Sequence, residues 1–311
     1  MKVVVTGGAG FIGSAFINYL KDNFECDVLC LDKLTYAGRR DNIKHNVSFL
    51  EKDICEVNAD ELGDFDYIVH FAAESHVDNS ISNGLPFVKT NVEGTFNLLE
   101  IARKNKNLKK FIHISTDEVY GDMAEHFAIN HTATEKDELK ASSYYSATKA
   151  ASDMLVLSAN RTYGLPYLIT RTCNNFGEHQ FEEKFLPTIA RSIKEGKPIP
   201  VYGDGLQVRE WMYVYDNVKV ICDLMFDDEV INQVMNIGTE FRLNNMDIIH
   251  IISNIMGKEV EIIHVEDRLG HDRKYGLNCK KLKGYYNQKY GHSDWVFSNL
   301  NDYLTKQYTP S

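Results

Sequence analysis

Residues 2–14 read KVVVTGGAGFIGS, and this stretch decides the fold. Its β-branched run, Val3 to Val5, predicts a short strand that ends at Thr6, just before a glycine turn. Apolar side chains then recur at the spacing of one helix face, at Phe11, Ile12, Ala15, Phe16 and Tyr19. The segment therefore predicts a strand, a tight turn and a helix in direct succession.

The same alternation continues along the chain. Short apolar runs that predict further strands lie at 27–32, 47–50, 66–71, 110–115, 165–170 and 234–237. Helical patterns lie at 86–104, 142–163 and 246–256. Strands that alternate with helices form parallel sheets with helices on both faces. We therefore expect an α/β fold, a doubly wound parallel sheet, with a smaller α/β domain built from excursions of the later chain.

The composition is that of an ordinary folded protein. Of 311 residues, 43% are hydrophobic and 25% are charged, which excludes a disordered or fibrous chain. The formal net charge of −10 argues against nonspecific binding to nucleic acid. The six cysteines show no CxxC or zinc-finger spacing, so neither a disulfide framework nor a metal site is predicted. Since no signal peptide or run of 18 apolar residues occurs, we expect a cytoplasmic protein without membrane contacts.

Gly7, Gly10 and Gly13 stand at the spacing GxxGxxG between the first predicted strand and helix. Glycines there let a turn close and let the backbone approach a pyrophosphate, whose charge lies at the helix N-terminus. Asp32 ends the second predicted strand, where a carboxylate can bind the ribose hydroxyls of adenosine. Because this carboxylate would repel a 2′-phosphate, the sequence predicts NAD rather than NADP as the cofactor.

Tyr145 and Lys149 stand four residues apart on the predicted helix 142–163 and so share one helix face. An ammonium group beside a phenol lowers the phenol pKa and makes it a usable base near neutral pH. In isolation a packed tyrosine with a solvated lysine is the simpler interpretation. The preceding glycine-turn motif favours a catalytic pair, and Tyr144 has no lysine four residues later.

Thr116, Asp117 and Glu118 follow the predicted strand 110–115, at the sheet edge where α/β proteins place their chemistry. Two neighbouring carboxylates repel each other, so one holds its proton more tightly and the pair can supply an acid and a base. From residues 115–118 alone, a polar turn is at least as good an interpretation.

With these residues in place, the chain resembles the extended short-chain dehydrogenase/reductase superfamily and, within it, the dTDP-glucose 4,6-dehydratase family. The similarity covers most of the chain and rests on VTGGAGFIGS (5–14), LDKLTYAG (31–38), HFAAESHVDNSI (70–81), ISTDEVYGD (114–122), YSATKAASD (145–153), NNFGEHQFEEKFLP (174–187), PVYGDGLQVREWMYVYDN (200–217), NIG (236–238) and DRLGHDRKYG (267–276). Thr116-Asp117-Glu118 is the mark of the dehydratases, because related epimerases carry small or hydroxyl residues at the two carboxylate positions. Tyr144, Glu182 and Leu269 replace the family's usual prolines, which leaves the base preference, dTDP or UDP, open.

The resemblance implies a set of binding residues. Those matching the family's contacts with NAD, which it retains tightly, are Gly7, Gly10, Phe11, Ile12, Gly13, Asp32, Lys33, Leu34, Thr35, Asp53, Ile54, Ala72, Ala73, Glu74, Ser75, Thr90, Tyr145, Lys149 and Asn175. Those matching positions around the nucleotide sugar are His76, Thr116, Asn174, Lys184, Phe185, Pro200, Val201, Tyr202, Arg209, Asn236, Asp267, Arg268, Leu269, Gly270 and His271. Lys184, Arg209 and Arg268 would supply the local positive charge that a diphosphate needs.

The resemblance also implies a mechanism. Tyr145 takes the C4 hydroxyl proton while a hydride passes from C4 to NAD⁺, and Thr116 hydrogen-bonds the same oxygen. Glu118 then removes the C5 proton, Asp117 protonates the departing C6 hydroxyl, and the hydride returns to C6. The cofactor ends as it began, so the net reaction is that of a hydro-lyase.

The same resemblance implies a domain organisation and an assembly. We expect residues 1–173, joined by 211–238, to form an NAD-binding Rossmann domain, and 174–210 with 239–311 to form the nucleotide-sugar-binding domain. We also expect a homodimer in which the helix near 91–104 and the catalytic helix make a four-helix interface.

Other functions stay open at this point. A UDP-sugar 4,6-dehydratase uses the same scaffold, as does a nucleotide-sugar 4-epimerase, which has no use for Asp117 and Glu118. A redox-inert NAD-sensing regulator is an alternative of another class, but such a protein would be expected to lack the Tyr145 and Lys149 pair.

Overall fold

The structure is a computed structural model that describes residues 1–125, 131–291 and 300–309. Residues 126–130, inside the first expected domain, and 292–299 and 310–311, inside the second, lie outside the described residues. Among the described residues, no helix is both long and apolar enough to cross a membrane.

The opening segment folds as predicted. β1 (Lys2–Thr6) leads through the glycine turn into α1 (Phe11–Asn23). A Cβ atom on Gly13 would lie 2.2 Å from the carbonyl oxygen of Gly7, and a Cβ on Gly7 would lie 2.5 Å from the amide nitrogen of Ala72. Because both contacts are with backbone, neither position can carry a side chain without moving the turn.

β1 lies inside a seven-stranded sheet with the order β10-β6-β5-β4-β1-β2-β3, and every neighbouring pair in it is parallel. The other strands are β2 (Asp27–Asp32), β3 (Ser48–Glu51), β4 (Tyr67–His70), β5 (Lys110–Thr116), β6 (Tyr167–Thr172) and β10 (Gln233–Ile237). This confirms the doubly wound parallel sheet. The order reverses between β1 and β4, where ligands bind at the carboxyl ends of such sheets.

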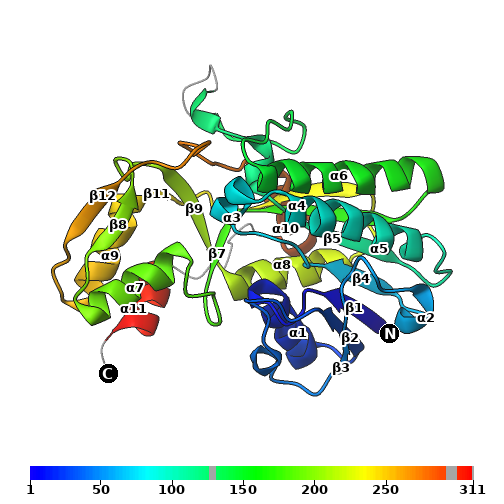
Figure 1. Cartoon of the computed structure of the whole chain (residues 1–311). Helices are drawn as coiled ribbons and strands as arrows, with labels where there is room; N and C mark the ends of the chain where they lie inside the picture. The colour runs from blue at the N-terminus through cyan, green and yellow to red at the C-terminus, as the bar shows by residue number, and fades with distance from the viewer. Residues whose placement is uncertain (126–130, 292–299, 310–311) are drawn as a thin grey trace.

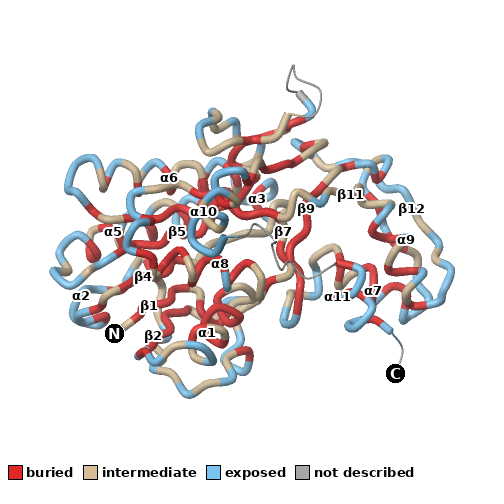
Figure 2. The backbone as a smooth tube through the Cα atoms, turned by 180° about the vertical axis from the view of Figure 1, so that it is seen from behind, coloured by how far each residue is buried: buried red, intermediate tan, exposed pale blue. Residues whose placement is uncertain are grey.

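Helices cover both faces of the sheet (Figure 1). α1, α8 (Val214–Phe226) and α10 (Lys280–Tyr290) pack on one face, and α5 (Thr95–Ala102) and α6 (Tyr144–Tyr163) pack on the other. Alternate residues of β1 point to opposite faces, so Val3 and Val5 join the first layer and Val4 joins the second. Figure 2 shows the inner strands of the large sheet, β1, β4 and β5, as nearly continuous buried segments between exposed loops.

The predicted helix 86–104 is divided into three parts. α4 (Leu85–Phe87) is followed by the π-helical segment η2 (Val88–Gly94) and then by α5. Gly94 leaves room for a neighbouring side chain, because a Cβ atom on it would lie 2.4 Å from Cδ1 of Ile54 and would force that side chain to move. The remaining short helices of this part of the chain are η1 (Arg40–Asn42), α2 (Ala59–Leu62), α3 (Val77–Ser82), η3 (Asp117–Tyr120) and η4 (Met123–Glu125).

A second apolar core lies beside the sheet, around Ile189, Trp211, Ile249 and Leu304. It is built from β7 (Asn174–Phe176), α7 (Phe185–Glu195), β8 (Ile199–Tyr202), β9 (Val208–Tyr213), β11 (Arg242–Asn244), α9 (Asn245–Met256), β12 (Ile262–Val265) and α11 (Leu300–Tyr308). The strands form two small sheets, β11-β9-β7 and β12-β8, and most of these elements stand apart from the large sheet in Figure 1. The late chain then returns, since Leu277, Cys279 and Leu282 pack into the core of the large sheet.

Candidate active site

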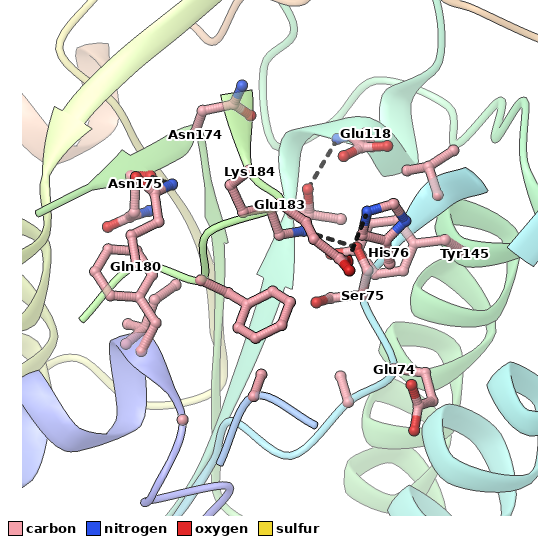
Figure 3. Close-up of a pocket in the computed structure, with 18 of the residues that line it drawn as sticks. Glu74, Ser75, His76, Glu118, Tyr145, Asn174, Asn175, Gln180, Glu183 and Lys184 are labelled. Carbon is pink, nitrogen blue, oxygen red and sulfur yellow. Dashed lines mark hydrogen bonds and ion pairs between the residues drawn. The ribbon is translucent and has the colours of Figure 1, made fainter. Parts of the chain in front are cut away.

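A cavity of about 680 Å³ lies between the carboxyl edge of the large sheet and the second core. The sheet contributes the β1–α1 turn and the ends of β2, β4, β5 and β6, and the other wall comes from β7, the start of α7, β8 and β9. In Figure 3, Glu118 and Tyr145 lie on one side of this cavity, and Asn174 and Asn175 lie on the other. The cavity thus forms where the strand order reverses.

Asp32 stabilises two backbone segments next to the cavity, the glycine turn and the loop after β2. Its carboxylate accepts hydrogen bonds from the backbone amides of Ala9, at 3.0 Å, and Leu34, at 2.8 Å. Burial raises the pKa of this carboxyl, and the two amides oppose the rise. The same carboxylate therefore fixes the glycine turn and the loop after β2, while it still lines the cavity.

These features fit a dinucleotide. The turn at Gly7 and Gly13 has no room for side chains, which leaves its backbone open to a close ligand. Across the cavity, Oδ1 of Asn175 is buried without a hydrogen-bond partner among the described residues. A buried amide oxygen without a partner is costly, so a ligand donor at this position would satisfy it.

Tyr145 lies in the first turn of α6, which is capped by Ser143. The Ser143 hydroxyl accepts a hydrogen bond of 3.1 Å from the amide of Ser146, and this capping box fixes the start of the helix. Tyr145 lines the cavity, whereas the neighbouring Tyr144 is 62% exposed. Helix geometry therefore selects Tyr145 for the cavity, as the spacing to Lys149 predicts.

The relation between Tyr145 and Lys149 differs from the one predicted. Lys149 was expected to lower the phenol pKa, but burial, Glu118 and Asp117 raise the pKa of Tyr145, and a hydrogen bond with Thr116 opposes the rise. The Lys149 ammonium instead donates a hydrogen bond of 2.7 Å to the carbonyl oxygen of Ile114. Burial lowers the pKa of Lys149 to about 8, and Asp153 opposes this change.

The chain turns where the two carboxylates meet. β5 ends at Thr116, the 3₁₀ helix η3 begins at Asp117, and the Thr116 hydroxyl accepts a hydrogen bond of 3.3 Å from the amide of Glu118. The turn brings Glu118 to the cavity wall. Asp117 lies directly behind it, 3% exposed, and accepts a hydrogen bond of 3.2 Å from the Thr116 hydroxyl.

Asp117 and Glu118 have different surroundings, which affect the pKa values of their carboxyl groups differently. Burial, Glu118 and Glu210 raise the pKa of Asp117 far above its usual range. Burial also raises the pKa of Glu118, but Arg268, Arg209 and Lys184 oppose that rise. The pKa of Asp117 is therefore raised more strongly than that of Glu118, which favours Asp117 as the acid and Glu118 as the base of the pair.

The three cations reach the cavity from separate segments. Arg209 donates to the carbonyl oxygens of Val208 and Asp272, both at 2.9 Å, and its guanidinium lies over the ring of Tyr275, 4.2 Å from the ring centroid. Lys184 donates to the carbonyl oxygen of Ser75 at 3.4 Å. These contacts place positive charge at one end of the cavity, although the protein as a whole carries a net negative charge.

A buried ion pair supports the catalytic helix from behind. Asp153, on α6, accepts a hydrogen bond of 2.9 Å from Nε of Arg171 and lies 3.4 Å from Nε2 of His113. Arg171 also donates to the Tyr120 hydroxyl at 2.8 Å. Burial lowers the pKa of His113 to about 4, so this histidine is neutral near pH 7.

The sequence of this chain is similar to those of a known protein family. Residues 3–238 match the sequence profile of the NAD dependent epimerase/dehydratase family. The chain belongs to this family. The low-salt glycan biosynthesis protein Agl12 of Haloferax volcanii is 47% identical over 291 residues, which cover 91% of this chain and 92% of that protein.

Two further relatives carry the name dTDP-glucose 4,6-dehydratase. The Escherichia coli protein is 37% identical over 341 aligned residues, which cover 97% of this chain and 94% of the relative. The crystal structure of DesIV from Streptomyces venezuelae, with NAD bound, matches with a TM-score of 0.88 and 36% identity over 98% of this chain and 95% of that one.

Most of the site residues predicted from the sequence line the cavity, but a few do not: Leu34, Asp53, Asp117, Asn236, Asp267, Leu269 and Gly270. Asn236 is fully buried, where it accepts a hydrogen bond of 2.7 Å from the Tyr120 hydroxyl. Asp53 accepts from the Cys55 amide at 2.9 Å, and Asp267 pairs with His271 at 2.6 Å. Leu269 is 78% exposed.

Several aromatic residues of the cavity wall were not singled out from the sequence. Trp211 and Tyr275 line the part formed by the second core. Tyr36 and Phe181 meet edge to face at 5.3 Å, from the loop after β2 and the loop before α7. All four lie inside motifs that carry the family resemblance, and this was the one signal available for them.

Proposed function

We infer that the protein is an NAD-dependent dTDP-glucose 4,6-dehydratase, which converts dTDP-glucose to dTDP-4-keto-6-deoxyglucose with loss of water. The observation that carries this inference is the strand end at Thr116, where Glu118 lines the cavity with Tyr145 and the buried carboxyl group of Asp117 lies beside them. A 4-epimerase needs a base for the C4 hydroxyl but has no use for this acid and base pair. The dehydratase relatives support the same activity.

The residues of the sheet edge would hold the cofactor. The Gly7 to Gly13 turn would receive the pyrophosphate, Asp32 the adenosine ribose, and Asn175 a polar group at the far end. When bound, NAD supplies a hydride acceptor that oxidises C4 and a hydride donor that reduces C6. Lys149, held against the Ile114 carbonyl, would keep a positive charge beneath this end of the cavity.

We propose the following roles for the side chains around the sugar. Tyr145, in the phenolate form that the positive charges of Lys149 and bound NAD⁺ would favour, accepts the C4 hydroxyl proton, and Thr116 hydrogen-bonds the same oxygen. Glu118 removes the C5 proton, which the new ketone has made acidic. Asp117 protonates the departing C6 hydroxyl, and its Oδ2 atom is suited to this because it has no hydrogen-bond partner among the described residues.

The cations would bind the diphosphate. Lys184, Arg209 and Arg268 approach the cavity from the second core and the loop after β12. Arg268 also faces Asp78 at 3.6 Å, and Tyr202 donates to the same carboxylate at 3.3 Å. A diphosphate carries enough negative charge to compete with Asp78 for Arg268.

A direct assay tests the proposed activity. The protein is incubated with dTDP-glucose, and the 4-keto product is followed by its alkali-induced ultraviolet absorbance. We expect product from dTDP-glucose and much less from UDP-, CDP- or GDP-glucose. No absorbance with any of the four would contradict dehydration, and faster reaction of UDP-glucose would contradict the base assignment alone.

The division into domains follows the two cores. We propose an NAD-binding domain of residues 1–173 with 211–238, joined also by the returning segment around 277–282, and a nucleotide-sugar-binding domain of 174–210 with the remainder of 239–311. The support is that the side chains of 277–282 pack with the large sheet. We also propose a cytoplasmic location, which agrees with six cysteines that are all unpaired.

We further propose a homodimer through α4, α5 and α6. Leu85 is 73% exposed, Phe96 53% and Met154 57%, although all three are large and apolar. An exposed apolar surface of this kind is typical of an interface. Sedimentation should show a dimer that Phe96→Glu weakens and that Ile263→Glu, on the exposed side of β12, leaves intact. A wild-type monomer would contradict this proposal.

A further inference from the structure

Two aromatic side chains meet where the cavity opens to solvent. Tyr36, in the loop after β2, and Phe181, in the loop before α7, lie edge to face, with ring centroids 5.3 Å apart and ring planes at 71°. This is a geometry that aromatic pairs prefer. Both residues line the cavity, and Tyr36 is also 47% exposed, so the pair lies at the cavity mouth. The two rings thus join the side of the large sheet to the side of the second core.

Each of these loops is anchored to a residue of the proposed cofactor site. The backbone amide of Leu34, two positions before the first ring, donates a hydrogen bond of 2.8 Å to the Asp32 carboxylate. Gln180, next to the second ring, donates from Nε2 to the carbonyl oxygen of Asn175 at 3.0 Å. Asp32 is proposed to receive the adenosine ribose, and Asn175 a polar group at the far end. The rings therefore come from loops that are fixed at opposite ends of the proposed cofactor site.

The backbone of both loops has an unusual conformation. Leu34 has a φ angle of +52° and His179 one of +65°, and each stands two positions before one of the two rings. Residues with a side chain adopt this left-handed conformation at a cost and only where the surrounding structure fixes them. Such residues cluster at active sites and ligand clamps. The two loops therefore hold a defined shape that directs the rings toward each other.

We propose that Tyr36 and Phe181 form an aromatic clasp that closes over bound NAD and slows its release, an assignment that rests on the proposed function. A cofactor that passes through this mouth must separate the two rings, which gives up their contact and exposes both to water. The proposed reaction returns the hydride to the same sugar. A site that keeps its cofactor throughout the turnover suits that reaction.

The test measures how fast NAD leaves the protein. Protein loaded with radiolabelled NAD is mixed with excess unlabelled NAD, and the bound label is followed by rapid filtration. We expect Tyr36→Ala and Phe181→Ala each to release NAD about 2- to 12-fold faster than wild type, the size of an aromatic pair's contribution. Tyr36→Phe keeps the ring and should release NAD at the wild-type rate. Tyr290→Ala is the matched control, because Tyr290 is 46% exposed but lies on α10, outside the cavity wall.

The double variant separates a clasp from two independent contacts with the cofactor. Tyr36→Ala combined with Phe181→Ala should release NAD no faster than either single variant, because one substitution already opens the clasp. Increases that multiply in the double variant would overturn the clasp, since each ring would then act alone. Release at the wild-type rate from both single variants would overturn it as well. Equal melting temperatures in thermal unfolding show that the variants are folded.

Failure of the clasp is distinct from failure of the proposed function. A wild-type protein that binds no NAD, or that forms no 4-keto sugar from dTDP-glucose, would contradict the function itself. A wild-type protein that does both, but whose NAD release is unchanged in Tyr36→Ala and Phe181→Ala, would contradict the clasp alone.

Discussion

The ammonium of Lys149 donates a hydrogen bond of 2.7 Å to the backbone carbonyl oxygen of Ile114. This bond ties α6, which carries Tyr145, to β5, which ends at Thr116. This bond therefore helps to hold the phenol of Tyr145 near the two carboxyl groups that follow β5. The predictions below follow from this arrangement.

Replacing Tyr145 by Phe removes the proposed base for the C4 hydroxyl. We expect turnover to fall by at least ~10², the size of a general-base contribution, with little change in nucleotide binding. Tyr144→Phe is the matched control, because Tyr144 is exposed and should tolerate the change. Steady-state assay of both variants checks this, and near wild-type turnover of Tyr145→Phe would move the base to another residue.

The cofactor preference depends on Asp32. Its carboxylate is fixed by the amides of Ala9 and Leu34 and lines the cavity, so it would face the 2′-phosphate of NADP. We expect NAD to bind more tightly than NADP in calorimetry. Equal or tighter binding of NADP would show that Asp32 does not meet the adenosine ribose.

The pH dependence of C5 deprotonation should report Glu118. As a base, Glu118 must be ionised, and burial raises its pKa above the usual value. Exchange of the C5 hydrogen with solvent should therefore be lost as the pH falls through this raised pKa. Arg268→Gln removes a charge that lowers the pKa, so the acid limb should move to higher pH.

Arg273→Gln provides the control for this shift. Arg273 pairs with Asp204 at 2.6 Å and is 43% exposed, outside the cavity wall. Its loss should leave the acid limb in place at saturating substrate. An acid limb that is identical in wild type and Arg268→Gln would show that another group controls the exchange.

The buried pair of Asp153 and Arg171 should be important for stability. Asp153→Asn leaves the guanidinium without its charge partner, and breaking a buried pair typically costs about 3–5 kcal/mol. Glu51→Gln breaks the exposed pair with Arg40, which should cost about 0–1 kcal/mol. Urea denaturation compares the two variants, and similar losses in both would contradict a special role for the buried pair.

The local sequence predicts the large sheet well and the second core poorly. β2 matches its predicted range, because a strand buried on both faces leaves a continuous apolar run in the sequence. β7 and β11 have only three residues each and are rich in asparagine, so no periodicity reveals them. They form only because β9 pairs with both of them.

The same limit applies within the site. The motif places Asp117 and Glu118 at a strand end, but their different surroundings come from distant residues such as Arg209 and Glu210. The contact between Tyr36 and Phe181 joins segments far apart in the sequence, so neither segment predicts it. The predicted direction of the Tyr145 pKa shift was wrong for a related reason, since burial, Glu118 and Asp117 raise that pKa.

The central claim is that one hydrogen moves from C4 to C6 of the same sugar while water is lost. Wild-type protein should be given dTDP-glucose labelled with deuterium at C4, and the product examined by NMR and mass spectrometry. We predict that the label appears at C6, and that an unlabelled substrate in deuterated water gains deuterium at C5. A label that stays at C4, in a sugar that keeps its C6 hydroxyl, would contradict dehydration and favour a 4-epimerase.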